Sequence, residues 1–372
     1  MCGICGVAGG EPGAARELVE LMCSALVHRG PDDQGIAQLG AVTLGMRRLS
    51  IIDLEGGHQP MHNADSTVWV TQNGEIYNYR ELRDQLAAAG HTFNTQSDTE
   101  VLVHAYEEWD ESMVERLNGM FAFAVLDRRR NTLFIARDRV GIKPLHYAID
   151  GRRLVFASEL KALLRDPALR REIDPVALDE YLAYEFVPSP RSIVRGIRKL
   201  EPGHTLTWSI ADGTARTRHY WTPELSLDPA IASLSVDERC EGLRAALRES
   251  VRKELISDVP LGVFLSGGID SSAVAATMTQ LGGEVKSFSV GFAERSFDEA
   301  PFARMVAQHL GTEHHELTLE PGMLLGLIPQ LQVLLDEPLG DASIIPTYLL
   351  SAFTRQHAVS YTHLTLPTNR EV

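Results

Sequence analysis

The sequence has few cysteines, no long apolar run and no excess of positive charge, and each shortage excludes a class of proteins. Only four cysteines, Cys2, Cys5, Cys23 and Cys240, occur in 372 residues. A disulfide framework is therefore excluded, and a reducing cytoplasm is the expected compartment. No apolar stretch reaches the roughly 18 residues of a membrane span, and no basic segment followed by an apolar core begins the chain. We expect neither a membrane-spanning segment nor a secretion signal.

The charge balance is acidic, with 35 lysines and arginines against 50 aspartates and glutamates and a formal net charge of −15. Such a chain is poorly suited to non-specific binding of nucleic acid or of an anionic membrane surface. Small-molecule chemistry fits this composition better. The length favours two domains, each with enough residues for its own core.

Cys2 is a candidate nucleophile because removal of the initiator methionine would place a thiol and a free α-amine on one residue. The thiolate is the reactive form of cysteine, and an α-amine with a reference pKa of about 7.7–8.0 can act as the adjacent base. The simpler interpretation is a small buried apolar residue. Cys2 and Cys5 form a C-x-x-C pair, but neither Cys23 nor Cys240 supplies a second pair at metal spacing, so we exclude a structural zinc site there. We expect Cys5 to pack inside the first strand.

Apolar spacing in the first half of the chain predicts strands separated by helices at wide intervals. This order favours sheets covered by helices over alternating βαβ units. The predicted strands cover residues 4–8, 42–46, 49–52, 68–72, 119–127, 132–138 and 153–157, and the predicted helices cover 14–26, 79–90 and 101–109, with another helix starting near 158.

Asn73 and Gly74 directly follow the strand predicted over residues 68–72. Asn-Gly is a strong turn signal, so a hairpin connection is the simple interpretation. The Asn73 amide and the backbone N–H of Gly74 would also supply the two converging donors that an oxyanion hole requires. Asp98 lies in the segment 97–100 (SDTE), a helix N-cap signature, and ordinary capping is its simple interpretation.

The pattern of predicted strands and helices changes after a proline-rich stretch, and we place a linker at residues 213–235. Beyond it, a long amphipathic helix is predicted over 236–257, an apolar strand over 259–265, a helix over 272–280, a strand over 285–291 and a helix over 300–310. Strands that alternate with helices in this order predict a parallel sheet with helices on its faces.

The segment Ser266–Ser272 (SGGIDSS) is a glycine- and hydroxyl-rich turn between the predicted strand and helix. Backbone N–H groups at a helix N-terminus favour an anion, and phosphate is the natural candidate. The segment lacks both the Walker lysine and the spacing of the dinucleotide fingerprint. Asp270 would repel a phosphate directly but fits as a Mg²⁺ ligand beside one. A tight turn that uses glycine only for its geometry remains an alternative.

Many ordered motifs resemble glutamine-hydrolysing asparagine synthetase of the B type, from Cys2 to about residue 359. The resemblance implies an N-terminal-nucleophile glutaminase with an αββα sandwich fold over 2–212, and a Rossmann-like ATP pyrophosphatase domain over 236–359. The motifs are MCGICG, HRGPDD, RRLSIID, NGEIYN, SDTE, GMFAFAVLDRR, ARDRVGIKPLHY and FASELKAL, followed by DVPLGVFLSGGIDSS, KSFSVGF and DEPLGDASIIPTYLLS.

The resemblance also implies roles for individual residues. Cys2 would attack the side-chain amide of glutamine, with Asn73 and Gly74 stabilising the oxyanion. The residues that would bind glutamine are Arg48, Leu49, Ser50, Ile51, Ile52, Asn73, Gly74, Glu75 and Asp98. The residues that would bind ATP are Leu265, Ser266, Gly267, Gly268, Asp270, Ser271, Ser272 and Val290, with Asp270 also binding Mg²⁺.

The implied activity is that of a ligase in asparagine biosynthesis. Ammonia from glutamine would amidate aspartate that ATP has activated, giving asparagine, glutamate, AMP and pyrophosphate. The implied partners are therefore glutamine, aspartate and ATP, without nucleic acid or membrane, and the resemblance allows a homodimer. A related amidotransferase acting on another carboxylate, in a polysaccharide or peptide pathway, is an alternative. A non-catalytic glutamine or nucleotide sensor on the same fold is another.

The resemblance ends before the glycine- and acid-rich loop with which members of this family continue. Residues 360–372 do not match the family, and we expect them to come from read-through at cloning or assembly. A second domain that ends here would leave an unpaired sheet edge. We therefore expect this chain to retain glutaminase activity and to lack synthetase activity.

Overall fold

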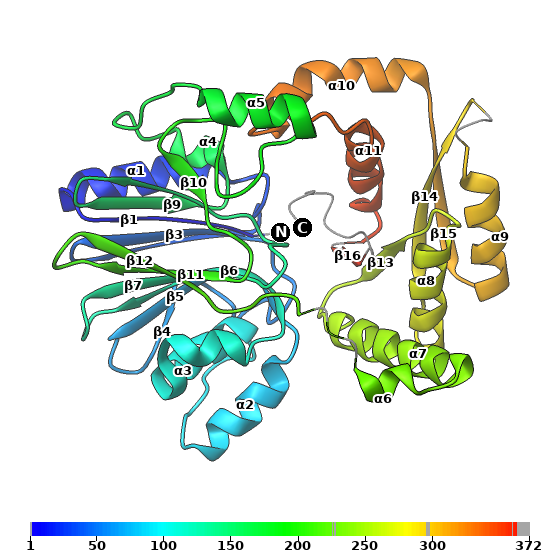
Figure 1. The fold of residues 1–372 in the computed structure, drawn as a ribbon, viewed down its shortest axis with the longest axis horizontal. Helices are drawn as coiled ribbons and strands as arrows, with labels where there is room; N and C mark the ends of the chain where they lie inside the picture. The colour runs from blue at the N-terminus through cyan, green and yellow to red at the C-terminus, as the bar shows by residue number, and fades with distance from the viewer. Residues whose placement is uncertain (1, 225, 227, 295–297, 359, 363–372) are drawn as a thin grey trace. The chain divides into compact units, whose positions relative to one another are not determined.

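The computed structural model describes residues 2–224, 226, 228–294, 298–358 and 360–362 (Figure 1). The chain forms two compact units. Among the described residues, the first unit contains the chain up to Thr222 together with Leu335–Gly340, and the second contains those from Pro223 to Leu334 and from Asp341 to Thr362. Within the described residues, no helix is both long and apolar enough to cross a membrane.

The first unit is built on two six-stranded sheets. All neighbouring strands within them run antiparallel. The first sheet has the order β10 (Ile197–Lys199), β8 (His146–Asp150), β9 (Arg153–Ala157), β1 (Gly3–Ala8), β3 (Val42–Arg48), β2 (Asp33–Leu39). The second has the order β12 (Thr214–His219), β11 (His204–Ser209), β7 (Thr132–Arg137), β6 (Gly119–Asp127), β5 (Val68–Ile76), β4 (Met61–His62).

Helices cover the outer faces of both sheets, which gives a helix, sheet, sheet, helix order of layers (Figure 1). Helices α1 (Pro12–Ala25) and α4 (Leu160–Leu163) pack on the first sheet. Helix α3 (Asp98–Trp109) packs on β5, and α2 (Tyr79–Ala88) and the 3₁₀ helix η1 (Asp110–Glu115) adjoin α3. Helix α5 (Pro175–Tyr184) completes the unit. This four-layer arrangement confirms the αββα sandwich that the family resemblance implied.

Strand β1 illustrates how the sequence specifies the layers, because successive strand residues face opposite sides of a sheet. Ile4 and Ala8 belong to the core between the two sheets, whereas Cys5 and Val7 belong to the core beneath α1. Cys5 is fully buried, as predicted, with its Sγ 3.6 Å from Sγ of Cys23. A Cβ on Gly45 would lie 2.4 Å from Val19 Cγ1, so glycine permits this close packing of α1.

Several local predictions differ from the structure. Residues 49–52, predicted as a strand, form a loop after β3. Asn73 and Gly74 are not a hairpin turn but lie inside β5, opposite Ala122 and Phe121 of β6. In the first unit, strands β2, β4, β8, β10, β11 and β12 and helices η1 and α5 were not predicted. The linker predicted at 213–235 contains β12, which pairs with β11 and therefore belongs to the first unit.

The second unit contains a parallel sheet of order β15 (Glu313–Leu319), β14 (Lys286–Phe292), β13 (Leu261–Phe264), β16 (Ser360–Thr362). Its helices are α6 (Pro229–Ala232), α7 (Val236–Glu254), α8 (Ile269–Leu281), α9 (Ala300–Leu310), α10 (Pro321–Leu334) and α11 (Ile344–Thr354). The alternation of strands and helices confirms the parallel sheet predicted from the sequence.

The second unit contains a capped helix, α7, and a short strand, β16, near the end of the described residues. Ser235 and Glu238 form a capping box at the start of α7, where each side chain bonds the backbone N–H of the other residue. Residues 360–362, predicted to lie in a tail outside the family, instead form β16, which pairs with β13. Residues 363–372, the rest of the predicted tail, lie outside the described residues.

Candidate active site

Cys2 lies just before β1 and is half-buried, with its thiol held against the loop that follows β3. The backbone N–H of Leu49 donates to Sγ at 3.4 Å, and Sγ is 3.6 Å from the Leu49 carbonyl oxygen. Burial raises the pKa of the Cys2 thiol, although the Leu49 N–H and the positive charges of Lys143 and Arg48 act in the opposite direction. The thiol is therefore mostly protonated at neutral pH and needs a base to become a nucleophile.

A partly buried ionic group fixes the backbone of Cys2. Arg29 donates from Nε to the Cys2 carbonyl at 2.8 Å and from Nη1 to Glu159 at 2.8 Å. Glu159 also lies 2.9 Å from Nε2 of His28 and 3.3 Å from Nζ of Lys161. The desolvation of Glu159 is outweighed by His28 and Arg29, which lower the pKa of this carboxyl to about 2. Our residue-level predictions missed this group, although Arg29 and Glu159 lie within the motifs HRGPDD and FASELKAL.

Glu159→Gln is expected to reduce the stability of the first unit at neutral pH, by up to about 3 kcal/mol for a pKa lowered from 4.5 to about 2. The native pKa lies below the unfolded value, so the contribution is complete above about pH 4.5 and is lost as the pH falls through 2. All four tryptophans lie in the first unit, so tryptophan fluorescence during unfolding reports on that unit alone. The difference in the free energy of unfolding between wild type and Glu159→Gln should become smaller as the pH falls from 7 to 3.

The matched control for this measurement is Glu172→Gln, because Glu172 is an exposed glutamate with a side chain 51% accessible. Its substitution should change the unfolding midpoint little at either pH. An equal midpoint for wild type and Glu159→Gln at pH 7 would contradict the stabilising role of Glu159.

Asn73 is completely buried in β5, and neither its amide nitrogen nor its amide oxygen has a hydrogen-bond partner among the described residues. Buried side-chain amides are nearly always hydrogen-bonded, so such a group requires an explanation. At the adjacent Gly74, a Cβ would lie 2.1 Å from the carbonyl oxygen of Met120 and 2.6 Å from Cα of Phe121. Glycine is therefore required here by the close approach of β6. A buried amide without a partner is suited to a ligand that supplies one.

Asp98 is buried and tied to the end of β5 that carries the candidate oxyanion donors. Its Oδ2 accepts from the Ile76 backbone N–H at 2.9 Å and from Nε2 of Gln72 at 3.2 Å. Burial raises the pKa of Asp98, and these hydrogen bonds partly offset the effect. Ser97 serves as the N-cap of α3 by accepting from the Thr99 N–H at 3.2 Å, as the sequence predicted. The carboxylate of Asp98 is thereby placed beside residues 72–76.

Arg48 is buried at the end of β3, where its guanidinium holds the loop after that strand. It donates to the backbone carbonyls of Ile52 at 2.9 Å, Asp53 at 2.6 Å and Leu54 at 3.1 Å. The Ser50 N–H donates to Asp32 at 2.9 Å, which anchors the other side of the same loop. The predicted glutamine-binding segment 49–52 is thus fixed at both ends, next to the thiol.

Lys143 is a further buried charge at this site that our sequence predictions missed. Burial lowers the pKa of Lys143, while the negative charge of Glu75 acts to raise it. The negative charge of an ionised Cys2 thiol also acts to raise the pKa of Lys143. The motif ARDRVGIKPLHY contains this lysine, but sequence alone gave no reason to connect it with Cys2.

In the second unit, residues 266–268 form a turn after β13, and residues 269–272 form the first turn of α8, which begins three residues earlier than predicted. The hydroxyl of Ser271 lies 3.0 Å from that of Ser266, which accepts from the Gly268 N–H at 3.3 Å. Gly268 is the N-cap of α8, so Asp270 lies in the first helical turn, with its side chain exposed. Within the described residues, the buried hydroxyl of Ser272 lacks a hydrogen-bond partner.

Leu265 directly follows β13, and Val290 lies near the carboxyl end of the neighbouring parallel strand β14. The Leu265 N–H donates to the carbonyl of Phe288 at 2.8 Å, and Val290 lies two residues further along β14. In open α/β sheets, ligands bind outside the carboxyl ends of the strands. The structure therefore brings the predicted nucleotide-binding residues to one edge of the sheet.

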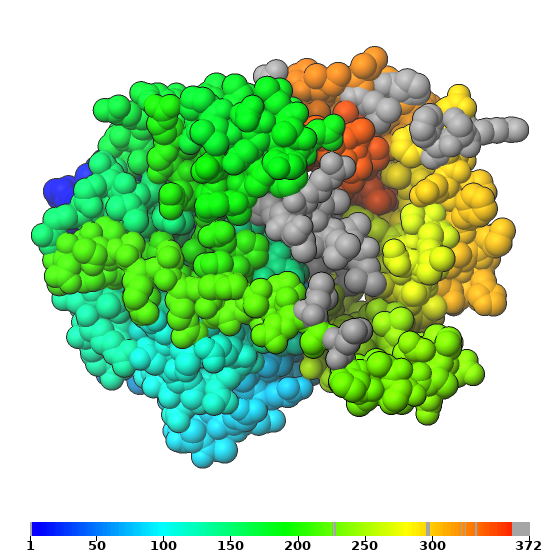
Figure 2. Space-filling model, in the orientation of Figure 1, coloured from blue at the N-terminus to red at the C-terminus, as the bar shows by residue number. Residues whose placement is uncertain are grey.

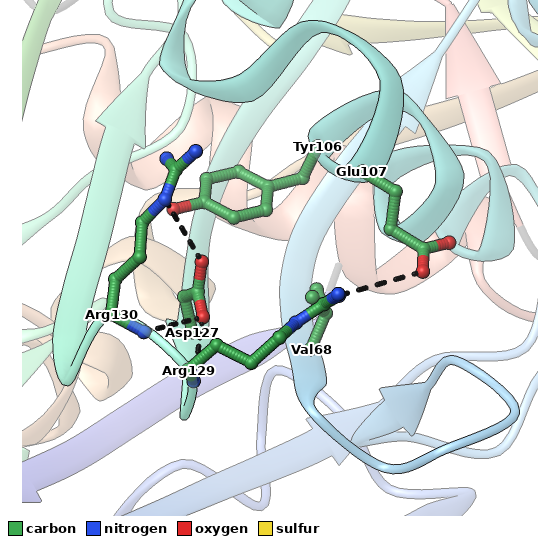
Figure 3. A pocket seen from close by; sticks show the side chains of 6 residues that line it. All are labelled: Val68, Tyr106, Glu107, Asp127, Arg129 and Arg130. Atoms are coloured by element: carbon green, nitrogen blue, oxygen red, sulfur yellow. Dashed lines mark hydrogen bonds and ion pairs between the residues drawn. The ribbon is translucent and has the colours of Figure 1, made fainter.

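A separate pocket of about 180 Å³ lies on the first unit and contains none of the predicted site residues (Figure 3). It lies where α3 meets the β6–β7 hairpin and is lined by Val68, Tyr106, Glu107, Asp127, Arg129 and Arg130. Burial raises the pKa of Tyr106 in this pocket.

Two family descriptions cover most of the chain. The sequence model described as "Glutamine amidotransferase domain" matches residues 1–221, and the one described as "Asparagine synthase" matches residues 242–362. Asparagine synthetase [glutamine-hydrolyzing] 1 of Bacillus subtilis (strain 168) is 39% identical over 361 residues, which is 96% of this chain and 56% of that protein. A putative asparagine synthetase [glutamine-hydrolyzing] 2 of Methanocaldococcus jannaschii is 35% identical and covers 96% of this chain and 72% of its own length.

The chain belongs to the glutamine-hydrolysing asparagine synthetase family. This confirms the resemblance noted in the sequence. A third relative, asparagine synthetase [glutamine-hydrolyzing] 3 of Bacillus subtilis (strain 168), is 35% identical over 91% of this chain and 57% of that protein. The chain thus spans 56% and 57% of the length of the two Bacillus subtilis relatives. The family match extends to residue 362, three residues beyond the end predicted from the motifs.

Proposed function

We propose that this protein hydrolyses glutamine at Cys2 and uses the ammonia to convert ATP-activated aspartate into asparagine. The observation that carries the glutaminase step is the buried Asn73 amide, which has no hydrogen-bond partner among the described residues. The next residue, Gly74, must be glycine because β6 approaches it closely. Together with the Cys2 thiol held at Leu49, it supplies a nucleophile and a site for the developing oxyanion.

In the proposed first step, Sγ of Cys2 attacks the side-chain amide carbon of glutamine. The α-amine of Cys2, freed by removal of Met1, accepts the thiol proton and passes it to the leaving nitrogen. The Asn73 amide and the Gly74 N–H stabilise the tetrahedral oxyanion, and ammonia leaves. Water then hydrolyses the γ-glutamyl thioester, which releases glutamate and restores the thiol.

The zwitterionic end of glutamine requires charges of both signs. We propose that Arg48 and the backbone of residues 49–52 bind the α-carboxylate, and that Glu75 and Asp98 bind the α-amine. Arg48 and Asp98 are both buried, and both are held in place by backbone groups of neighbouring segments. Their orientation is therefore set before glutamine binds, which reduces the entropy cost of binding.

We propose that Ser266–Ser272, with Leu265 and Val290, binds ATP in the second unit. The Ser272 hydroxyl and the N–H groups of the first turn of α8 are suited to phosphate oxygens. The exposed Asp270 carboxylate fits a Mg²⁺ ion, which would neutralise phosphate charge during transfer of AMP to the aspartate carboxylate. We further propose a cytoplasmic, homodimeric enzyme that binds no nucleic acid.

The test of this function follows nitrogen from glutamine labelled with ¹⁵N in its side-chain amide. The purified chain should release labelled ammonia and equimolar glutamate. With Mg-ATP present, candidate acceptors such as aspartate and other amino-acid or sugar carboxylates are then compared for formation of a labelled amide, both with the chain as given, which we expect to form none, and with a version extended to the length of its Bacillus subtilis relatives. Absence of ammonia release would contradict the glutaminase, and labelling of another carboxylate in preference to aspartate would contradict the proposed acceptor.

Gly267→Ala is expected to weaken ATP binding by at least tenfold. Gly267 has φ of +81°, and a Cβ there would lie 2.6 Å from the backbone atoms N of Ala303 and C of Phe302. The substitution must therefore displace the turn from α9 and from the start of α8. Equilibrium binding of a fluorescent ATP analogue measures the effect.

Gly282→Ala is the matched control, because Gly282 also has a positive φ (+93°) but a Cβ there would meet nothing within 4 Å. It should lower the stability of the second unit while leaving ATP affinity close to that of wild type. Equal nucleotide affinity in wild type and Gly267→Ala would contradict the assignment of this turn.

A further inference from the structure

Two histidines and one glutamate, from a loop and a helix, lie close together in the first unit. His91 lies in the loop after α2, whereas His104 and Glu107 lie three residues apart on α3. Each offers one potential ligand atom, and these three atoms all lie within 4.8 Å of one another. Oε2 of Glu107 is 2.9 Å from Nδ1 of His104 and 3.6 Å from Nδ1 of His91.

We propose that this cluster, the His91–His104–Glu107 site, binds a divalent first-row transition metal ion such as Zn²⁺. Bonds of about 2.0–2.2 Å place tetrahedral ligand atoms roughly 3.4 Å apart, and the two distances from Glu107 lie on either side of that value. Two imidazole nitrogens and one carboxylate oxygen suit zinc, whereas Ca²⁺ and Mg²⁺ prefer oxygen ligands alone.

Carboxylates on the far side of both imidazole rings support this assignment. Nε2 of His91 lies 3.2 Å from Oε2 of Glu108, and Nε2 of His104 lies 3.9 Å from Oε1 of Glu100. Each ring thus directs Nδ1 towards Glu107 and Nε2 towards another carboxylate. Metal-binding histidines commonly donate their second N–H to a carboxylate, which orients the ring and increases its basicity.

The second oxygen of Glu107 is held by other partners. Nδ2 of Asn63 donates to Oε1 at 2.8 Å, and Nη2 of Arg129 lies 3.9 Å from the same oxygen. Figure 3 shows Arg129 extending along the pocket towards the Glu107 carboxylate. These contacts leave Oε2 as the atom that faces the histidines, so Glu107 is oriented as a ligand through one oxygen.

The surroundings combine a buried side with a route for an ion from solvent. His104 is buried, and its ring packs edge-on against Phe93 with centroids 4.7 Å apart. His91 is less buried, and Glu107 is the most exposed of the three. Figure 2 shows the segment of α2 and α3, in cyan, at the surface of the molecule. A water molecule can therefore complete a tetrahedral shell.

Binding is tested on the full chain carrying Cys2→Ala and Cys240→Ala, which remove the two thiols that are not buried and could also bind metal. Titration with Zn²⁺ against a chromophoric chelator should give one saturable site. The double substitution His91→Gln, His104→Gln should weaken the affinity at least 100-fold, and Glu108→Gln should weaken it about tenfold. Co²⁺ bound at this site should show an absorption spectrum of nitrogen and oxygen ligands without a thiolate charge-transfer band.

The matched control is His309→Gln, which removes an exposed histidine near the end of α9 and should leave the affinity unchanged. Circular dichroism and tryptophan fluorescence verify that each variant is folded. The single substitution His91→Gln replaces only a loop residue and provides the comparison if the double variant does not fold. Absence of saturable Zn²⁺ binding in the parent, or equal affinity after loss of His91, would overturn the proposal and leave a proton-sharing network of histidines and glutamates.

Discussion

Replacement of Cys2 by alanine is expected to reduce ammonia release from glutamine by at least about ten-thousand-fold. The loss is large because the proposed thioester cannot form without Sγ, and the remaining donors accelerate only the slow attack of water. Glutamine should still bind with nearly unchanged affinity, since the thiol contributes little to recognition of the zwitterionic end. A coupled assay for glutamate and ammonia, together with isothermal titration of glutamine, measures the two effects separately.

Cys240→Ala is the matched control for this experiment, because Cys240 is an exposed cysteine on α7, in the other unit. It should retain full glutaminase activity. Cys2→Ser should be nearly as inactive as the alanine variant, because a hydroxyl is a far weaker nucleophile than a thiol near neutral pH. Steady ammonia release by Cys2→Ala would contradict the assignment of the nucleophile and would exclude the proposed thioester.

Replacement of Asn73 by alanine is expected to lower kcat for glutamine hydrolysis by about 10²–10³-fold with little change in KM. An oxyanion donor acts mainly on charge that develops in the transition state, and removal of one such donor has effects of this size. A purely structural amide would behave differently, because its loss would reduce stability and would not act selectively on kcat. Steady-state kinetics and tryptophan-monitored unfolding, carried out on the same preparations, distinguish the two cases.

The conservative variant Asn73→Asp sharpens this test, since it preserves shape but replaces the amide donor by a carboxylate. It should be at least as inactive as the alanine variant, because a negative charge opposes the oxyanion. Asn118→Ala, an exposed asparagine in the loop before β6, serves as the control and should keep wild-type kinetics. A rise in KM with unchanged kcat for Asn73→Ala would mean that Asn73 binds glutamine without stabilising the transition state.

The sequence by itself indicated sheets covered by helices in the first unit and alternating strands and helices in the second, whereas the four layers were implied by the family resemblance. Residues 4–8 are all apolar or glycine, which predicts a short buried strand, and in β1 one face packs against the other sheet and the other face against α1. Strands alternating with helices after residue 259 likewise required a parallel sheet. These features are local patterns of hydrophobicity, which the chain carries irrespective of its distant contacts.

Predictions from the sequence were wrong where pairing between distant segments decides the structure. Asn73-Gly74 is a turn signal locally, but β6 pairs with it along the whole length of β5 and holds it extended. Short strands such as β12 are stabilised by a neighbouring strand and carry little apolar pattern of their own. Motif resemblance located Cys2, Arg48, Asn73 and Asp98, but it could not supply the contacts among them.

Only the tertiary structure decided how charged groups far apart in the chain are combined. Arg29 and Glu159 are separated by 130 positions, yet their ion pair fixes the backbone of Cys2. His91 meets His104 and Glu107 only because α2 and α3 pack together. Such contacts depend on the fold as a whole, since each requires two segments to reach the same place from different parts of the chain. The sequence therefore determined which chemical groups are present, and the packing of sheets and helices decided which of them act together.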